Sequence, residues 1–388
     1  MKARERAGAS SRRAQPMHAA GLAAPALNTT AKRAAGRAYA DGMSTDTLSD
    51  VLRAVRLGGA VFFTIEGTPP WVAEAPPARA VASRVMPGAE HVIEYHVVTS
   101  GRCWGGLVGG PPVQLEAGDI IVFPQGDPHV VSSAPGMRGK TDLDVFQRPP
   151  GQQLPVVLNV GSGGSEERTQ MVCGFLGCDA RPFNPLLAAL PRVLHVRDAA
   201  GAGGVLGPFV RLALEESEAR RAGSECVLAR LSELMFVEVV RRYVAGLPAE
   251  QTGWLAGLRD DVVGRALARL HDRPAHGWSL DDLSREIGAS RSVLAERFTH
   301  LVGVPPMQYL TQWRMQLAAG LLAGGTASLA EVADQVGYGS EAALSRAFKR
   351  LVGVAPALWR QRRRDPEGFP AAAPDSAPPP APAVLAEA

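Results

Sequence analysis

Two segments near the C-terminus carry similar sets of polar and small side chains at matching positions. The first set is Arg291, Ser292, Ala295 and Glu296, and the second is Glu341, Ala342, Ser345 and Arg346. Arginine donates hydrogen bonds to O6 and N7 of guanine and glutamate accepts one from N4 of cytosine, and each good contact contributes roughly 1–3 kcal/mol of discrimination. These residue types suit the reading of base edges. Because Ser292, Ala295 and Ala342 are small, we expect direct readout to be sparse.

Further basic side chains in this region suit contacts to phosphate. Arg314, Lys349 and Arg350 are the candidates, since phosphate contacts position a protein on DNA without reading its sequence. Residues 277–364 hold 11 Lys and Arg against 7 Asp and Glu, whereas the net charge of the whole chain, +3, is too small to predict a partner. The alternative for any one of these arginines is a solvated helix face.

The elements that must position these side chains form a repeat, with one copy at 279–306 and the other at 328–356. In the first copy Leu280, Leu283 and Ile287 share one helical face, Ser279 is a helix cap, Gly288 ends the helix, and Ser290 caps a second helix. In that second helix we expect Val293, Leu294 and Phe298 to face the core. The spacing therefore predicts a helix-turn-helix unit.

The second copy repeats this pattern, with Gly337 at the turn and Ser340 as the cap of the second helix. Pro305 and Pro306 begin a long intervening helix that Gly324 ends. Such a helix would fix the separation of the two units, whose second helices could enter successive major grooves.

Residues 258–362 resemble the DNA-binding domain of the AraC/XylS family. The resemblance rests on the tandem units, on the Leu-Val-Gly-Val-x-Pro phrase that closes each of them, and on the Val-Gly-Tyr run at 336–338. It implies that promoter DNA is a partner, that RNA polymerase is another, and that the positions named above, with Ser290 and Ser340, contact DNA.

The region 61–147 changes to short β-prone runs separated by Gly and Pro, which predicts a sandwich or small barrel. The Gly-x5-Pro-x-Gly-x2-His run at 118–129 resembles the second cupin motif. The Glu-x6-Gly run at 94–101 fits part of the first, but Pro87 and Ala89 replace its two histidines. The resemblance implies a cupin-like domain of the type associated with AraC proteins.

Three side chains at inward positions of this domain could form a site: Glu94, His96 and His129. A carboxylate with two imidazoles could hold Zn²⁺ or Fe²⁺ with an open position, so a divalent metal is one expectation. The favoured interpretation is packing or hydrogen bonding to a small-molecule effector, because a metal needs three well-placed donors and the expected histidine pair is missing.

Four cysteines at irregular spacing predict neither a disulfide framework nor a zinc ribbon, which fits a reducing cytoplasm. Some cupin-containing AraC proteins sense reactive chlorine through cysteines, and Cys103 lies in a matching Gly-x-Cys-Trp phrase. An oxidant effector acting on Cys103 or on the pair Cys173 and Cys178 is therefore a hypothesis that requires an exposed thiolate. Buried, inert cysteines are the default interpretation.

Composition and motifs divide the chain into five parts: a disordered tail at 1–42, a cupin-like sensor domain at 43–180, a helical connector at 181–257, the DNA-binding domain at 258–362, and a Pro/Ala tail at 363–388. The first tail is basic, as a nucleic-acid-binding arm would be, but a start placed too far upstream is favoured. An apolar stripe at 227–240 predicts core packing or a homodimer interface. No stretch has the length of a membrane span, so no membrane partner is expected.

These observations predict a multidomain α+β protein, with an N-terminal cupin-like β-barrel, a helical connector and an all-α tandem helix-turn-helix domain. The predicted function is a cytoplasmic, sequence-specific transcription factor with a small-molecule or oxidant effector and no certain cofactor. One alternative is a cupin-fold metalloenzyme with an accessory helical domain. Another is a DNA-binding protein of the nucleoid type, without sequence specificity.

Overall fold

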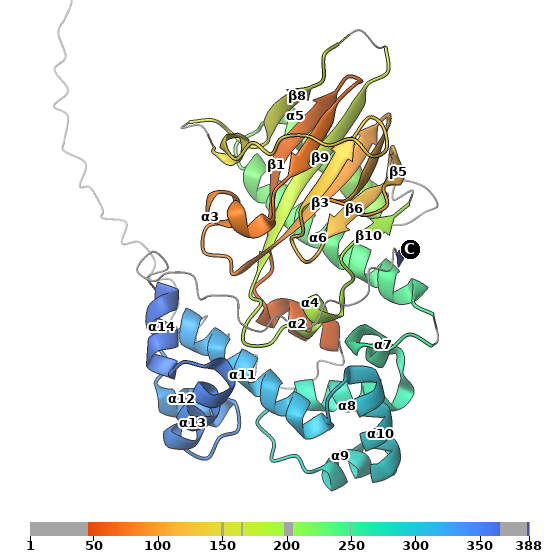
Figure 1. The fold of residues 1–388 in the computed structure, drawn as a ribbon. Helices are drawn as coiled ribbons and strands as arrows, with labels where there is room; N and C mark the ends of the chain where they lie inside the picture. The colour runs from red at the N-terminus through yellow and green to blue at the C-terminus, as the bar shows by residue number, and fades with distance from the viewer. Residues whose placement is uncertain are drawn as a thin grey trace, which may run out of the picture. The chain divides into compact units, whose positions relative to one another are not determined.

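The computed structural model describes residues 46–148, 151–163, 166–197, 205–248, 250–364 and 386–387 (Figure 1). Its β-rich half holds two sheets, a larger one with strand order β11-β10-β6-β3-β9-β1-β8 and a smaller one with order β2-β7-β4-β5. The strands are β1 Gly58–Gly67, β2 Val72–Ala75, β3 His91–Ser100, β4 Arg102–Leu107, β5 Val113–Glu116, β6 Ile120–Phe123, β7 His129–Ser132, β8 Val156–Val160, β9 Thr169–Cys178, β10 Leu194–Val196 and β11 Ala386–Glu387. The cupin-like fold class is confirmed.

Strands β3 and β9 lie side by side in the middle of the larger sheet and pair antiparallel along most of their length. Strand β3 is buried from Val92 to Val98, and β9 is buried from Met171 to Cys178. Because both faces of these strands are covered, the buried part of β9 is continuously apolar, and that of β3 is apolar apart from Glu94 and His96. One face contributes to the core between the sheets, and the other packs against helices.

The helices of the predicted connector are part of this β-rich body. Helix α5 (Leu206–Ala219) packs on α6 (Ser224–Gly246), and α6 packs on β1, β9 and β10 (Figure 1). The Tyr95 hydroxyl and the Ser232 hydroxyl share a hydrogen bond of 2.6 Å between strand and helix. The boundary predicted at residue 180 is therefore wrong, because the sheet needs these helices to cover its outer face.

Part of the apolar stripe on these helices stays exposed. Val227 and Leu234 of α6 are 40% and 47% exposed, and Leu212 of α5 is 43% exposed, whereas Leu228 and Leu231 are buried. The stripe therefore has a core side and a solvent side.

The first helix, α2 (Thr47–Ala54), packs with the C-terminal helices, and two short helical turns, η1 Ala78–Ala80 and α3 Ala82–Val85, follow β2. A third short turn, η2, spans Asp144–Phe146. The remaining helices are α4 Pro185–Ala189, α7 Trp254–Arg259, α8 Asp261–Asp272, α9 Leu280–Glu286, α10 Arg291–Val302, α11 Pro306–Gly324, α12 Leu329–Gln335, α13 Glu341–Val352 and α14 Pro356–Arg364. No described helix combines the length and apolar character needed to cross a bilayer.

Asp260 separates α7 from α8, and its carboxylate caps α8 by accepting hydrogen bonds from the backbone amides of Val262 and Val263. The domain end predicted at residue 362 lies in the last turn of α14, which continues to Arg364. The tail predicted at 1–42 and most of the one at 363–388 lie outside the described residues.

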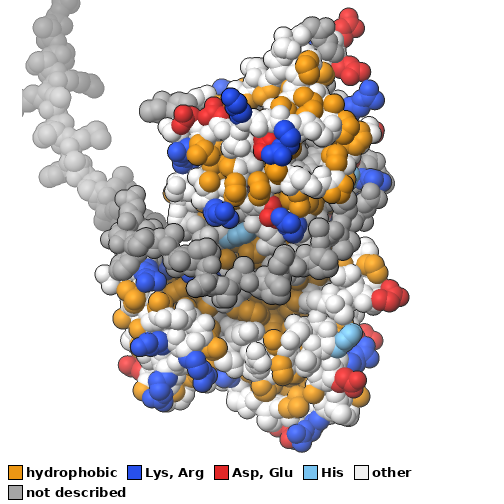
Figure 2. Space-filling view, viewed as in Figure 1, with side chains coloured by type: hydrophobic (Ala, Val, Ile, Leu, Met, Phe, Trp, Pro, Cys, Tyr) orange, Lys and Arg blue, Asp and Glu red, His pale blue; other side chains and the backbone are white. Residues whose placement is uncertain are grey.

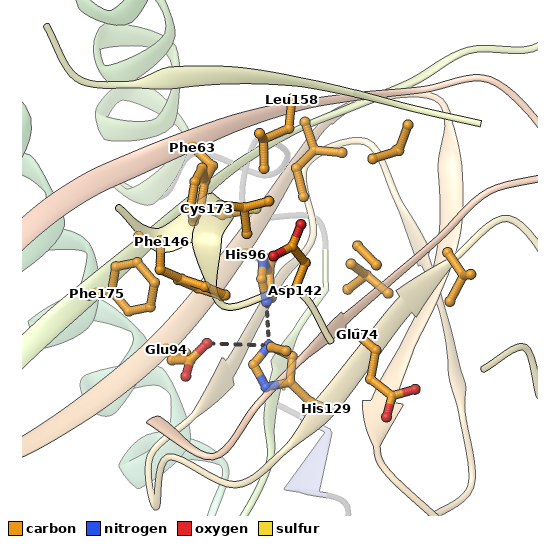
Figure 3. Close-up of a pocket in the computed structure, with 18 of the residues that line it drawn as sticks. Phe63, Glu74, Glu94, His96, His129, Asp142, Phe146, Leu158, Cys173 and Phe175 are labelled. Atoms are coloured by element: carbon orange, nitrogen blue, oxygen red, sulfur yellow. Dashed lines mark hydrogen bonds and ion pairs between the residues drawn. The ribbon is translucent and has the colours of Figure 1, made fainter. Parts of the chain in front are cut away.

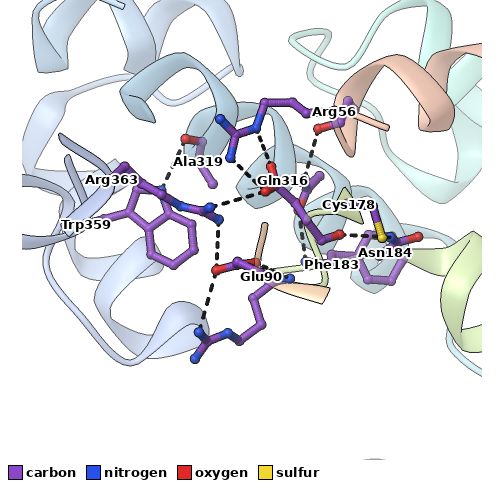
Figure 4. A network of polar contacts seen from close by, with 12 residues as sticks. Arg56, Glu90, Cys178, Phe183, Asn184, Gln316, Ala319, Trp359 and Arg363 are labelled. Carbon is purple, nitrogen blue, oxygen red and sulfur yellow. Dashed lines mark hydrogen bonds and ion pairs between the residues drawn. The ribbon is translucent and has the colours of Figure 1, made fainter. Parts of the chain in front are cut away.

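Polar contacts connect the ends of β3 and β9 to the last helix (Figure 4). Glu90 directly precedes β3 and Asp179 directly follows β9. Arg363 of α14 lies 2.8 Å from Glu90 and 3.2 Å from Asp179. Arg56 donates two hydrogen bonds of 2.7 Å to Asp179. The side chains of Arg363, Glu90 and Asp179 are 12%, 13% and 7% exposed, so their ion pairs are shielded from solvent and salt, whereas Arg56 is 45% exposed.

A buried glutamine of α11 makes a second connection. Gln316, 1% exposed, accepts a hydrogen bond of 3.0 Å from the Phe183 amide and donates one of 3.1 Å to the Ala54 carbonyl (Figure 4). Replacing it would leave both backbone groups without this partner. The strands of the larger sheet and the helices of the C-terminal half are thus joined by specific contacts.

Candidate functional site

The first helix-turn-helix unit consists of α9 and α10. Ser279 caps α9 by accepting from the Asp282 amide at 3.0 Å, and Ser290 caps α10 by accepting from the Val293 amide at 3.3 Å. Gly288 between them has φ +67°, a conformation that favours glycine. These caps and the turn occur at the predicted residues.

The second unit consists of α12 and α13. Ser328 and Glu331 form a capping box at the start of α12, and Ser340 caps α13 by accepting from the Ala343 amide at 3.2 Å. Gly337 has φ +76° at the turn. Leu344 and Phe348 are fully buried, as are Leu294 and Phe298 in the first unit. Each second helix is therefore fixed by its inner face.

The opposite faces carry the residues predicted to contact DNA. Those that are exposed are Ser290, Arg291, Ser292, Glu296, Ser340, Glu341, Ala342, Arg346, Lys349 and Arg350, and Ala295 and Ser345 are half-buried. Val293 was expected in the core but is 42% exposed, so that expectation is wrong. An exposed apolar side chain there can contact a thymine methyl group. Leu294 and Phe298 are four residues apart and define the buried face of α10. This spacing places Val293 at the edge of that face and could have predicted its exposure.

Acidic neighbours hold the arginines of the first unit. Arg291 lies 2.8 Å from Asp281, Arg285 lies 3.2 Å from Asp282, and Arg297 pairs with Asp260. The pairs of Arg291 and Arg285 are exposed on both sides and contribute little to stability, whereas Asp260 is only 11% exposed. They do lower the net positive charge that the first unit offers to a phosphate backbone.

The second unit lacks such pairing in the part of the chain that is described. Arg346, Lys349 and Arg350 are exposed and form no ion pair with a described residue. Figure 2 shows Lys and Arg side chains spread over the surface of the α12–α14 region, with few acidic ones among them. This surface has the charge that attracts phosphate.

Arg314 makes contacts within the protein. Its guanidinium donates to the backbone carbonyls of Pro274 at 2.7 Å and His276 at 2.8 Å and lies over the ring of Tyr338. Burial lowers the pKa of Arg314. These two backbone contacts compete with the phosphate contact predicted for Arg314. Arg314 connects α11, in which it lies, to the segment before α9.

A cavity of about 200 Å³ lies between the two sheets (Figure 3). Strands β1, β2, β3, β7, β8 and β9 and the segment 140–146 line it. Its wall is mostly apolar, and Glu94, His96 and His129 supply the polar groups inside it. All three are at most 7% exposed, so the structure brings together the three side chains that the sequence placed at inward positions.

The hydrogen bonds of the two histidines define their tautomers. Nδ1 of His129 lies 3.0 Å from the Asp127 carbonyl oxygen, which can only accept, so this nitrogen carries a proton. Burial lowers the pKa of His129 to about 4 and that of His96 well below its usual value, so both rings are neutral near pH 7. Nε2 of His129 therefore accepts the proton of His96 Nε2 across 2.7 Å. Nδ1 of His96 is left as a bare, buried acceptor without a hydrogen-bond partner among the described residues.

Glu94 faces the same pair (Figure 3). Its Oε2 lies 3.7 Å from His129 Nε2, beyond hydrogen-bond distance, and its Oε1 has no hydrogen-bond partner in the described chain. Burial raises the pKa of Glu94 to about 8, so the carboxyl is mainly protonated near pH 7. The polar end of the cavity is thus uncharged and offers both a donor and acceptors.

Glu94, His96 and His129, the candidate metal ligands, are arranged to hydrogen-bond rather than to hold a metal ion. Among the described residues no group of three His, Cys, Asp or Glu side chains is arranged to hold a metal ion. The two imidazoles use their facing nitrogens for each other, and neither points a shared lone pair at a common centre with Glu94. The donor set therefore does not fit a Zn²⁺ or Fe²⁺ site.

The candidate sensor cysteines are all buried. Cys103, Cys173 and Cys178 are 1%, 3% and 4% exposed and are free thiols. Burial raises the pKa of Cys103 and of Cys178 to about 12 and that of Cys173 well above its usual value. The reactive thiolate is therefore scarce at neutral pH, which counts against oxidant sensing through these residues.

Comparison with protein families gives two matches. A cupin family matches residues 46–245, and a helix-turn-helix domain family matches residues 283–362. The cupin match extends across α5 and α6, in agreement with their packing on the larger sheet.

Curated proteins similar to this chain along most of its length are transcription regulators. An AraC-like transcription regulator of Streptomyces lividans is 34% identical over 70% of this chain and 88% of its own. The regulator AlkR of Acinetobacter baylyi is 29% identical over 71% and 89%, and RclR of Escherichia coli strain K12, an RCS-specific transcriptional activator, is 25% identical over 71% and 87%. Among solved structures, the DNA-binding domain of AdpA in complex with a target DNA is 31% identical over 28% of this chain and 99% of its own, with a TM-score of 0.26.

Proposed function

Because the chain belongs to the AraC family of DNA-binding transcription regulators with an N-terminal cupin domain, we propose that its two helix-turn-helix units read one bipartite promoter site under the control of the cupin cavity. The observation that carries this proposal is the pair of capped units, each with a buried inner face and an exposed polar outer face on its second helix.

Helices α10 and α13 are the proposed reading helices. Arg346 and Glu341 in α13 and Arg291 and Glu296 in α10 have the side chains that recognise guanine and cytosine in the major groove. Lys349 and Arg350 continue the exposed face of α13 and suit neighbouring phosphates. The exposed residues differ between the helices, so the two halves of the site should differ in sequence.

The proposed signal is a small molecule in the cavity. Two of the strands that line the cavity are β3, which Glu90 directly precedes, and β9, which Asp179 directly follows, and both carboxylates pair with Arg363 of the DNA-binding half. A shift of β3 or β9 on ligand binding would change these contacts. The ligand would then bind more tightly to one arrangement of the two halves than to the other, and so favour that arrangement. The burial of the candidate cysteines favours this signal over an oxidant that reacts with their thiols.

Further partners follow from the family. We propose RNA polymerase as the protein contacted at the promoter and the cytoplasm as the site of action. A homodimer through the exposed apolar residues Leu212, Val227 and Leu234 would place two copies on repeated half-sites.

Genome-wide footprinting of the protein in its host tests the proposal. We expect discrete sites upstream of genes, with the Arg346→Ala variant losing occupancy at the strongest of them. Uniform coverage without discrete sites would instead favour a DNA-binding protein of the nucleoid type.

The metalloenzyme alternative has a separate test. Metal analysis of the purified full-length protein, repeated on His129→Ala, would have to find a stoichiometric metal that the variant loses for that alternative to stand. The hydrogen bond between the two imidazoles leads us to expect no such metal.

A further inference from the structure

We infer that the cavity between the two sheets takes an uncharged molecule with one aromatic ring and one hydroxyl or amide group, which hydrogen-bonds Glu94 and His96. This inference rests on the proposed function, in which the cavity is the effector site. It names the chemical class of the effector from the size of the cavity, its aromatic wall and the state of its polar groups.

The size and wall of the cavity favour one aromatic ring. An apolar cavity of about 150 Å³ admits benzene, so about 200 Å³ has room for a ring with a short substituent. Phe63, Phe146 and Phe175 line the cavity, and the rings of Phe63 and Phe146 lie 5.5 Å apart at 81°. Phe175 meets both rings in the same edge-to-face manner. Such a wall presents ring faces and edges to another ring.

The polar end of the cavity favours a group that both donates and accepts. The backbone contact of His129 leaves His96 with a bare acceptor at Nδ1, and Glu94 has an Oε1 without a hydrogen-bond partner among the described residues. Both groups are buried, and leaving buried polar atoms unpaired costs free energy. A hydroxyl or an amide can donate to one of these atoms and accept from a protonated carboxyl.

The charges around the cavity disfavour an ionic ligand. Inside it, the titratable neighbours of Glu94 are His96, His129 and Cys173, all buried and held in their neutral forms. At the rim, Lys140 and Asp142 have opposite charges. The remaining rim carboxylate, Glu74, is bound by Arg138 at 2.7 Å. An anion would find no buried cation, and a cation would require Glu94 to ionise where water is excluded.

Isothermal titration of the full-length protein with four ligands of one shape tests this inference. The probes are benzyl alcohol, benzylammonium, benzoate and toluene, which share the ring and differ in charge and hydrogen bonding. We expect benzyl alcohol to bind at least tenfold more tightly than each of the other three. Tighter binding of benzylammonium or benzoate would overturn the assignment, and equal binding of toluene would remove the role of the polar groups.

Substitutions at Glu94 locate the binding site. Glu94→Gln keeps an uncharged donor and acceptor of the same shape and should hold benzyl alcohol within about threefold of the parent protein, whereas Glu94→Leu should lose at least tenfold, as expected for one buried hydrogen bond. The matched control is Glu74→Gln at the rim, which should change the affinity little. If Glu94→Leu does not fold, the comparison of the four probes on the parent protein and on Glu94→Gln decides the question. A loss in Glu94→Gln equal to that in Glu94→Leu would show that a carboxylate is needed and would contradict the inference.

A DNA-binding measurement on the same protein separates the two proposals. Fluorescence anisotropy with a labelled promoter site shows whether the regulator itself is active. If the protein binds its site but not benzyl alcohol, the ligand class is wrong and the regulator stands. If it binds benzyl alcohol in a Glu94-dependent manner but no DNA site, the proposed function is wrong and the ligand class stands.

Discussion

The two helix-turn-helix units share a backbone and differ in how their charges are used. Both have serine caps, a left-handed glycine at the turn and a second helix fixed by leucine and phenylalanine. In the first unit Arg291 pairs with Asp281, whereas in the second unit Arg346 and Lys349 have no ion pair with any residue that the structure describes.

The difference indicates that the repeated parts of the sequence specify the fold and the varied parts divide the work of binding. Buried and capping residues are kept because each unit must present a rigid helix. The exposed charges are free to differ, so we expect the second unit to supply most of the attraction to phosphate and the stronger base contacts, while Asp281 weakens those of Arg291 in the first. The predictions below test this division, from the largest expected effect to the smallest.

The turn glycines should respond unequally to substitution. Both have positive φ, which costs about 1–2 kcal/mol for other residues. A Cβ on Gly337 would also lie 2.4 Å from the Ala275 carbonyl oxygen, whereas one on Gly288 would meet nothing within 4 Å. We expect Gly337→Ala to lower the free energy of unfolding by about 3 kcal/mol or more and Gly288→Ala by about 1 kcal/mol. Urea denaturation measures both, and equal losses would show that the backbone near Ala275 yields.

Base reading by α13 should exceed that by α10. Arg346→Ala should weaken specific binding by roughly 1–3 kcal/mol, confined to one or two base pairs. Arg291→Ala should cost less, because Asp281 already competes for its guanidinium. Gel shifts with singly substituted sites measure the profile. An equal loss for Arg346→Ala on specific and scrambled DNA would assign this residue to phosphate.

The salt dependence of binding should separate the units as well. Lys349→Ala and Arg350→Ala should each reduce the slope of log K against log salt by about 1 and weaken all sequences alike. Arg285→Ala and Arg297→Ala, the matched changes in the first unit, should leave the slope nearly unchanged because carboxylates already neutralise these arginines. The same drop in slope for all four variants would remove the proposed asymmetry.

The smallest expected effect is a gain. Asp281→Asn frees Arg291 from an exposed ion pair, which is worth at most about 1 kcal/mol. We expect severalfold tighter binding of the promoter site, measured by fluorescence anisotropy. The gain should vanish in the Arg291→Ala background, because there is then no arginine to free. A gain that persists there would show that the loss of the negative charge itself tightens binding.

Local features of the reading units could be predicted from the sequence. The caps at Ser290 and Ser340 and the turns at Gly288 and Gly337 depend on residues a few positions apart. The pairing of Arg314 with the carbonyls of Pro274 and His276 joins segments about 40 residues apart, and no periodicity reveals it. In the β-rich half, too, features without a local sequence pattern were not predicted. Strand β9 was not predicted because its apolar run contains glycines and lacks alternation.

The candidate site was only partly predictable for a related reason. The inward positions and the cupin resemblance identified Glu94, His96 and His129, and the structure brings them together. Their protonation depends on the Asp127 carbonyl beside His129 and on burial by strands far along the chain. The sequence alone therefore left a metal site open beside the favoured interpretation, packing or hydrogen bonding to an effector, and did not predict the charge of the ligand.

Hydroxyl-radical footprinting of the full-length protein on its strongest promoter site tests the central claim most directly. Two helix-turn-helix units reading one bipartite site should protect two segments about 10 base pairs apart. Arg346→Ala should reduce protection of one segment and leave the other. A single protected segment, or equal loss of both segments in that variant, would contradict the claim that each unit reads its own half of the site.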